Sequence, residues 1–309
     1  MTSPALSVVS TLYRSADTIE EFVRRSAAAA RELVGDSYEI VLVNDGSPDN
    51  SWDLAVGLRE VEPRLVLIDL SRNFGHHVAL LEGVSHASGD LIYLIDSDLE
   101  EAPEWLIDFS RRMVSEHADV VFGYQAKRKG GWFERVSGAI YWSIFRGLSG
   151  LDLPKNIVTC RLMSRRYVDA LLRHHEREVS MGAIFAITGF EQIAVPVPKT
   201  HKGSSTYSLR LKVWHLVNSI AAFSTKPLNA IFLLGAAVSI IASAILAYLL
   251  FSAVFRGRAP AGWLSVMASV WLLGGLLLLS LGVIAIYLGK VFAEVKARPR
   301  AIVRSIERR

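Results

Sequence analysis

The first 125 residues alternate between short apolar runs and segments in which apolar residues recur with helical spacing. Five apolar runs predict strands, at residues 6–12, 38–43, 66–70, 91–95 and 120–122. Segments with a period near 3.6 predict helices, at residues 18–34, 51–60, 78–85 and 105–115. Strands and helices that alternate at this spacing predict right-handed crossovers and a mainly parallel sheet, so we expect an α/β fold.

Two later stretches contain no Asp, Glu, Lys, Arg or His: residues 227–255 and residues 259–289. About 20 helical residues cross a bilayer core that is about 30 Å thick, so each stretch is long enough to span it. We therefore predict a hairpin of two transmembrane helices within 227–289. Residues 207–226 show an amphipathic pattern, which predicts a helix in the membrane interface. An ordinary helix that packs on a protein core is the alternative for that segment.

The charges are unevenly distributed along the 309 residues. Residues 227–309 hold nine of the 34 Lys and Arg but two of the 30 Asp and Glu, which leaves 25 basic and 28 acidic residues in 1–226. The positive excess therefore belongs to the membrane part, and nucleic-acid binding is not expected. The basic tail at 290–309 predicts, by the positive-inside rule, that both chain ends face the cytoplasm.

The expected organisation is thus a catalytic domain at 1–206, an interface helix at 207–226, two spans at 227–289 and a basic cytoplasmic tail at 290–309. It describes a multi-pass protein of the inner membrane whose catalytic domain lies in the cytoplasm. Glycines in the second span would allow close helix packing, which is compatible with a homo-oligomer.

Four carboxylates lie within six residues directly after the apolar run 91–95, namely Asp96, Asp98, Glu100 and Glu101. Ligands of parallel sheets bind beyond the carboxyl ends of the strands, where this cluster is expected. Carboxylate oxygen is the ligand that Mg²⁺ and Mn²⁺ prefer, with water and phosphate oxygens completing the shell. A metal held there would neutralise a diphosphate leaving group. The alternative is a solvated acidic loop before the helix that begins at Trp105.

Two further strand ends carry polar groups. Asp45 follows the run 38–43 and could accept the imide hydrogen of a uracil, although an Asn-Asp-Gly-Ser stretch is commonly just a turn. Arg72 follows the run 66–70 and offers a forked donor to phosphate. The neighbouring His76 and His77 match no familiar zinc spacing.

These motifs, taken in order, resemble glycosyltransferase family 2, and within it the polyprenyl-phosphate glycosyltransferases related to dolichol-phosphate mannose synthase and bactoprenol glucosyltransferase. The resemblance covers nearly the whole chain. It is carried by Ser71-Arg-Asn-Phe-Gly75, by Asp96-Ser-Asp98 and by Arg161-Leu-Met-Ser-Arg-Arg166.

The resemblance implies a GT-A fold and a metal-dependent enzyme that uses Mg²⁺ or Mn²⁺. Its implied catalytic residues are Asp96 and Asp98, which would bind the metal together with Glu100. The implied donor-binding residues are Thr11, Tyr13, Asp45, Arg72 and Asp96. The implied contacts to the acceptor phosphate are Arg128, Arg135, Ser205 and Tyr207.

The expected reaction is inverting transfer of one sugar from a nucleotide-sugar, with UDP as the expected nucleotide, to polyprenyl (undecaprenyl) phosphate. The chain departs from the family pattern at Thr159, where relatives carry an aspartate sometimes proposed as catalytic base. A lipid phosphate has its second pKa near 6 and is largely ionised at pH 7, so it needs no such base. We therefore expect an active enzyme despite Thr159.

Two other functions are compatible with a domain of this kind. A processive polysaccharide synthase would need a channel of several spans and a Q-x-x-R-W motif, and this sequence contains no such motif. A non-catalytic membrane scaffold that retains the fold would explain Thr159 and the unusual Arg14, but it has no need for the acid pair Asp96 and Asp98.

Overall fold

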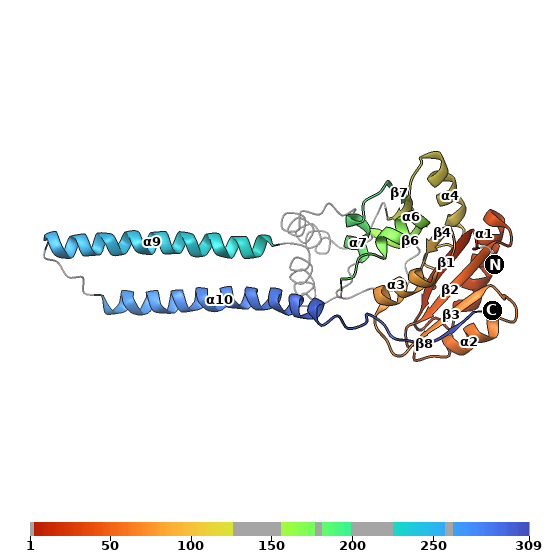
Figure 1. Ribbon diagram of the computed structural model, residues 1–309, viewed down its shortest axis with the longest axis horizontal. Coiled ribbons are helices and arrows are strands. Elements are labelled where there is room, and N and C mark those ends of the chain that lie inside the picture. Colours follow the sequence, from red (N-terminus) through yellow and green to blue (C-terminus); the bar gives the residue numbers. More distant parts are fainter. Residues whose placement is uncertain (1–2, 126–155, 177–180, 199–224, 257–261, 309) are drawn as a thin grey trace. The chain divides into compact units, whose positions relative to one another are not determined.

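The computed structural model describes residues 3–125, 156–176, 181–198, 225–256 and 262–308. They contain an eight-stranded sheet with the order β7-β5-β6-β4-β1-β2-β3-β8 (Figure 1). The strands are β1 (Leu6–Leu12), β2 (Tyr38–Asn44), β3 (Leu65–Leu70), β4 (Leu91–Leu94), β5 (Val120–Tyr124), β6 (Ile157–Ser164), β7 (Gln192–Pro196) and β8 (Val303–Glu307). Strands β4, β1, β2 and β3 are mutually parallel, so the α/β, mainly parallel prediction is confirmed.

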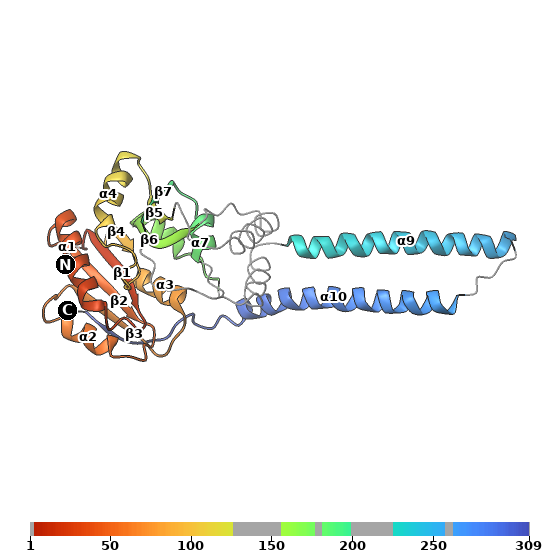
Figure 2. The same cartoon turned by 180° about the vertical axis from the view of Figure 1, so that it is seen from behind.

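Helices cover both faces of this sheet (Figures 1 and 2). One apolar core lies between the sheet and the helices α1 (Ile19–Val34), α2 (Ser51–Leu58) and α4 (Trp105–Ser115). The other core lies between the sheet and the helices α3 (His76–His86), α6 (Arg165–Leu171) and α7 (Met181–Ile187). Strands β1, β2 and β3 are buried along their whole length, as expected when both faces of a parallel sheet are covered.

The predicted strands and helices of the first 125 residues all form, with ends that differ by one or two residues. Helix α4, for example, spans the predicted 105–115, and it buries Leu106, Phe109 and Met113 at helical spacing. Strand β8 was not predicted. It comes from the basic tail, belongs to the same compact unit as the sheet and pairs with β3 in antiparallel register.

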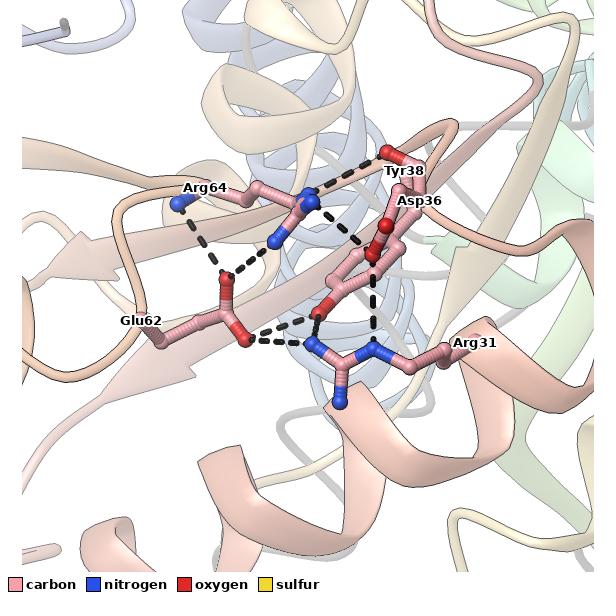
Figure 3. A network of polar contacts seen from close by, with 5 residues as sticks. All are labelled: Arg31, Asp36, Tyr38, Glu62 and Arg64. Carbon is pink, nitrogen blue, oxygen red and sulfur yellow. Dashed lines mark hydrogen bonds and ion pairs between the residues drawn. The ribbon is translucent and has the colours of Figure 1, made fainter.

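Polar side chains gather at the edge of the sheet where the parallel strands begin (Figure 3). Tyr38 at the start of β2 donates its hydroxyl to Glu62 at 2.7 Å and accepts a hydrogen bond from Arg31 at 2.9 Å. Arg64 forms ion pairs with Asp36 at 2.8 Å and with Glu62 at 3.4 Å. Burial, followed by the nearby Glu62, raises the pKa of Tyr38 to about 12. This network fastens α1 to the loop before β3, away from the edge where ligands of such sheets bind.

The compact unit outside the sheet contains α9 (Lys226–Arg256) and α10 (Trp263–Val295), which contact one another. In the described part of the chain, one helical segment is long and apolar enough to cross a membrane by length and composition, the 24 residues Leu272–Val295 of α10. The apolar part of α9 at Lys226–Ala242 is shorter. The second span therefore stays a prediction, as does the interface helix, of which the structure describes residues 225–226.

Gly46, just after β2, has a close neighbour across the strand ends. Its φ is +60°, and a Cβ there would lie 2.5 Å from the backbone nitrogen of Asn73 and 2.7 Å from the carbonyl carbon of Arg72. Gly35 has a similar φ of +62°, but a Cβ there would meet nothing within 4 Å. The two loops after β2 and β3 therefore pack together only because residue 46 has no side chain.

We predict that Gly46→Ala lowers the free energy of unfolding by about 3–4 kcal/mol, because backbone strain and a steric clash add. Gly35→Ala is the matched control and should cost roughly 1–2 kcal/mol, because it introduces strain without a clash. Thermal unfolding of the purified variants in detergent measures both. Equal losses of stability in the two variants would show that the close approach at Gly46 is unimportant.

Candidate functional site

The strand order brings the predicted site residues to one edge. Strands β4, β1, β2 and β3 are adjacent and parallel, so their carboxyl ends meet there. Asp96 follows β4, Thr11 lies near the end of β1, Asp45 follows β2, and Arg72 follows β3. The sheet thus places residues from four adjacent strand ends along one edge, while their roles in binding stay predictions.

Asp96 is held by side chains from two other elements. Its side chain is 18% exposed, and the Nε2 atom of His76 lies 3.2 Å from its Oδ1 atom. Thr159 on β6 donates its hydroxyl to Oδ2 of Asp96 at 2.8 Å. The other ring nitrogen of His76 lies 3.1 Å from the hydroxyl of Thr11. One carboxylate therefore connects α3, β6 and, through His76, β1.

The charge of His76 depends on its acidic neighbours. Burial alone would lower its pKa, but the hydrogen bond to Asp96 and the charges of Asp96, Asp45 and Glu101 raise it. The His76 ring therefore holds Asp96 in place, and the acidic neighbours favour the protonated form of the ring. Sequence reasoning considered His76 for zinc and missed this role. Its place at the start of a helix after a strand end was the available signal.

The acidic loop after Asp96 turns sharply. Leu99 has a φ of +61°, and the backbone N–H of Glu100 donates to Oδ1 of Asp98 at 2.9 Å. Asp98 is exposed, whereas Glu101 is completely buried and accepts a hydrogen bond from the backbone N–H of Thr159 at 3.1 Å. Glu101 therefore supports β6 from inside the fold and does not share the exposed position of Asp98.

The described residues contain no group of three or more His, Cys, Asp or Glu side chains that could hold a metal ion. The prediction that Asp96, Asp98 and Glu100 bind a metal together thus stays a prediction. Two carboxylates at one strand end nevertheless fit Mg²⁺ in their chemistry, because this ion commonly binds through one or two carboxylates and fills its other positions with water and phosphate.

Asp45 holds the loop that leads into α3. The residue is 2% exposed, and its two oxygens accept the backbone N–H groups of Phe74 at 2.7 Å and Gly75 at 3.1 Å. Burial raises the pKa of Asp45, although both amides and the cations His76 and Arg72 act in the opposite direction. The predicted contact to a nucleotide base remains untested, and the observed role of Asp45 is to fix the loop at 71–75.

The other predicted donor residues differ in exposure. Thr11 is buried, whereas Tyr13 is 47% exposed at the end of β1, with the Arg14 guanidinium 5.7 Å from its ring centre. Arg72 is exposed, lies 4.0 Å from the ring centre of Phe74 and donates to the carbonyl of Asn73 at 2.9 Å. Tyr13 and Arg72 are thus available to a ligand from solvent. The predicted acceptor residues Arg128, Arg135, Ser205 and Tyr207 lie outside the described residues.

A serine-rich cluster around Asp49 organises the loop after β2. The hydroxyls of Ser47 and Ser51 donate to Oδ1 of Asp49 at 2.5 and 2.6 Å, and the N–H of Ala16 donates to Oδ2 at 3.2 Å. Burial alone would raise the pKa of Asp49, but these hydrogen bonds lower it to about 2. Asp49 thereby links the ends of β1 and β2.

Arg161 is an unexpected buried cation on β6. It is 2% exposed, its guanidinium carbon lies 3.3 Å from the ring centre of Phe185, and burial lowers its pKa to about 10. It lines a cavity of about 310 Å³ together with Phe122, Ile157 and residues of α7. Thr159 and Arg161 are two residues apart on one strand, so their side chains leave the same face of the sheet. Sequence reasoning used Arg161 in a motif but gave it no role.

We predict that Asp49→Asn lowers the free energy of unfolding at pH 7 by about 1 kcal/mol, a value reduced for solvent screening of a partly exposed group. Because the folded pKa lies below the usual value of 3.8, this stabilisation is present above pH 4 and is lost as the pH falls toward 2. Unfolding measured between pH 7 and pH 3 tests this. The control Asp53→Asn changes an exposed carboxylate of α2 and should have little effect. The prediction would be contradicted if the free energies of unfolding of the wild type and of Asp49→Asn differed by the same amount at pH 7 and at pH 3.

The chain is similar to a known protein family and to individual proteins of two bacteria. The family described as glycosyl transferase family 2 matches residues 7–172. A protein of Mycobacterium tuberculosis described as a glycosyltransferase is 46% identical over 301 residues, which cover 97% of this chain and 88% of that protein. The glycosyltransferase YkcC of Bacillus subtilis is 31% identical over 300 residues, which cover 96% of this chain and 92% of that protein.

Solved structures with a related fold are more distant. The mannosyltransferase PcManGT from Pyrobaculum calidifontis, in complex with GDP-Man and Mn²⁺, is 18% identical with a TM-score of 0.49. That likeness covers 96% of this chain and 88% of PcManGT. TarS 1–349 of S. aureus, in complex with UDP-GlcNAc, is 18% identical with a TM-score of 0.47 and covers 70% of this chain and 65% of TarS.

The family match includes every motif on which the resemblance was based, from Asp45 through Asp96 to Arg161. The two relatives extend the similarity over nearly the whole chain. This confirms the expected glycosyltransferase and its GT-A-like α/β domain. The polyprenyl-phosphate type remains a prediction. The chain belongs to glycosyl transferase family 2.

Proposed function

We propose that this glycosyltransferase transfers a single sugar, with inversion, from a nucleotide-sugar to polyprenyl phosphate at the cytoplasmic face of the inner membrane. UDP is the proposed nucleotide and undecaprenyl phosphate the proposed lipid. The observation that carries the proposal is the oriented carboxylate of Asp96 beside exposed Asp98, in a chain that also contains the apolar helix α10.

The carboxylates of Asp96 and Asp98 would hold Mg²⁺ or Mn²⁺, which when bound neutralises the charge of the diphosphate leaving group. Glu100 is proposed as a further ligand. The hydrogen bonds from Thr159 and His76 fix the direction in which Asp96 presents its oxygens. A carboxylate that is held in place loses little conformational freedom when its ligand arrives.

Donor binding is assigned to the neighbouring strand ends. The exposed ring of Tyr13 offers a surface for a base or ribose, and the exposed Arg72 offers a forked donor to the phosphates. Thr11 and Asp45 are proposed to complete the donor site, and both side chains are buried. The base contact of Asp45 would require its carboxylate to accept a further hydrogen bond beside those from Phe74 and Gly75.

The reaction needs no protein base. An oxygen of the lipid phosphate attacks the anomeric carbon, the bond from that carbon to the diphosphate breaks, and the nucleoside diphosphate leaves. The attacking phosphate is already ionised at pH 7, so no proton has to be removed. This agrees with Thr159, whose hydroxyl donates to Asp96 and does not act as a base. Arg128 and Arg135, with Ser205 and Tyr207, are proposed to bind the lipid phosphate.

The apolar helices support a membrane location. Leu272–Val295 is long enough to cross a bilayer, and we propose that α9 supplies the second span. A lipid acceptor is confined to the membrane, so an enzyme anchored there meets it at high local concentration. The basic residues that follow α10 favour a cytoplasmic position for the catalytic domain.

Purified full-length protein incubated with undecaprenyl phosphate, Mg²⁺ and a panel of sugar nucleotides should give a sugar-phospholipid, detected by mass spectrometry. Asp96→Asn and Asp98→Asn should each reduce the rate by about 100-fold or more, because the leaving-group charge loses its neutralisation. Asp90→Asn, at the opposite end of β4, is the matched control and should retain activity. No product from any donor would refute the proposed function. Binding of a sugar nucleotide without turnover would favour the scaffold.

Thr159→Val removes the hydroxyl but keeps the volume of the side chain. We predict that it lowers kcat by less than about tenfold, because His76 still holds the Asp96 carboxylate when this one hydrogen bond is lost. Thr159→Ser keeps the hydroxyl and should retain nearly full activity. Steady-state kinetics with saturating donor and lipid measures both variants. Abolished turnover in Thr159→Val, with donor and lipid binding intact, would mean that Thr159 takes part in the chemistry.

A further inference from the structure

Strand β8 begins at the carboxyl end of its partner strand β3, the end at which the candidate site lies. It pairs with β3 from Leu67 opposite Glu307 to Leu70 opposite Val303, with an irregularity between Asp69 and Leu70. Beyond β3, the backbone N–H of Ser71 donates to the carbonyl of Ile302 at 2.8 Å. The chain that follows α10 is thus bonded to the start of the loop that carries Arg72.

Arg304 makes two side-chain contacts at this irregularity. Its Nη1 atom lies 2.8 Å from Oδ2 of Asp69, and its Nη2 atom donates to the carbonyl of Ser71 at 2.9 Å. The Asp69 side chain is 6% exposed, whereas the Arg304 side chain is 63% exposed. Asp69 is therefore a nearly buried carboxylate whose cation comes from the last residues of the chain. A buried charge that loses its partner is strongly unfavourable.

Hydrogen bonds connect Asp69 to the loop after β2. Its Oδ1 atom accepts the side-chain amide of Asn44 at 2.7 Å, and Oδ1 of Asn44 accepts the backbone N–H of Ser47 at 3.0 Å. These bonds fix the turn that contains Asp45 and Gly46. Asp45 in turn holds the N–H groups of Phe74 and Gly75. One guanidinium thus supports both strand-end loops to which donor binding is assigned.

We propose that Arg304 is a positioning residue for the nucleotide donor and that β8 is part of the donor site. This inference rests on the proposed function, because it assigns the loops 44–47 and 71–75 to the donor. Docking of β8 and binding of the nucleotide are then coupled, and each favours the other to the same extent. Arg304 does not touch the donor. It acts through Asp69, Asn44 and the carbonyl of Ser71.

A second ion pair on β8 provides a matched control. Glu307 binds Arg59, at the end of α2, at 2.6 Å. Glu307 lies opposite Leu67 in the middle of β3, whereas Arg304 contacts Asp69 and Ser71 at its carboxyl end. Both ion pairs fasten the same strand, but in the described structure only the Arg304 pair is connected to the turn at Asn44.

The experiment compares Arg304→Gln, Arg304→Lys and Glu307→Gln with the wild type in the full-length protein. Calorimetry with UDP and Mg²⁺, and with GDP and Mg²⁺ as a second probe, measures nucleotide affinity. We expect about tenfold weaker binding of the preferred nucleotide in Arg304→Gln and partial recovery in Arg304→Lys. Glu307→Gln should stay within about twofold of the wild type. In turnover assays, the KM for the donor should rise in Arg304→Gln, while kcat and the KM for the lipid change by less than about twofold.

Hydrogen exchange of the wild type gives a test that requires no variant. Bound UDP should slow exchange of the β8 backbone amides, because coupling is reciprocal. Unchanged affinity in Arg304→Gln, or equal losses in Arg304→Gln and Glu307→Gln, would overturn the inference and leave the proposed function standing. Failure of the wild type to bind either nucleotide would overturn the proposed function and the inference with it.

Discussion

The structure of the site depends on how the chain keeps several carboxylates at one edge of a sheet. Parallel strands bring Asp45, Asp69 and Asp96 to the same edge, where their charges would repel each other. Each carboxylate is stabilised differently. Asp45 accepts two backbone amides, and Asp69 binds Arg304 and Asn44. Asp96 binds His76 and Thr159. Because each carboxylate is bound by partners from other elements than its own, these bonds also hold the loops together. Polar networks that are fully bonded have this effect in protein interiors.

These hydrogen bonds leave a functional difference between the acidic groups. Asp45 and Glu101 are buried and bonded to backbone amides, so they support neighbouring loops. Asp98 is exposed and Asp96 is half-buried, so their oxygens can reach a ligand from solvent. The four carboxylates that lie together in the sequence therefore divide into one completely buried residue, Glu101, and three that are at least partly exposed, Asp96, Asp98 and Glu100. Residue type and spacing could not make that distinction, because burial depends on the fold.

Much of the sheet domain could be predicted from the sequence, because its first half is built from local patterns. The apolar runs of β1 and β2 and the helical period of α4 can each be recognised within one short stretch of the sequence. The bond from Thr159 to Asp96 joins residues 63 positions apart, and that from Arg304 to Asp69 joins residues 235 apart. No periodicity encodes such pairs. The sequence could show that Thr159 replaces an expected aspartate, but only the fold shows that its hydroxyl donates to Asp96.

Strand β8 was missed for a related reason, and its position has consequences for folding. Val303–Glu307 is rich in charge, and only its pairing with β3 gives it strand structure. Without β8, β3 would be an edge strand with unpaired backbone groups, which is a common site of aggregation. In the sequence, α9 and α10 lie between β7 and β8. β8 can therefore cover β3 only after both apolar helices have been synthesised, and pairing of strands so distant in sequence is slow. The loops supported by Arg304 would gain their final order at the same step, which makes completion of the candidate site depend on the strand that follows α10.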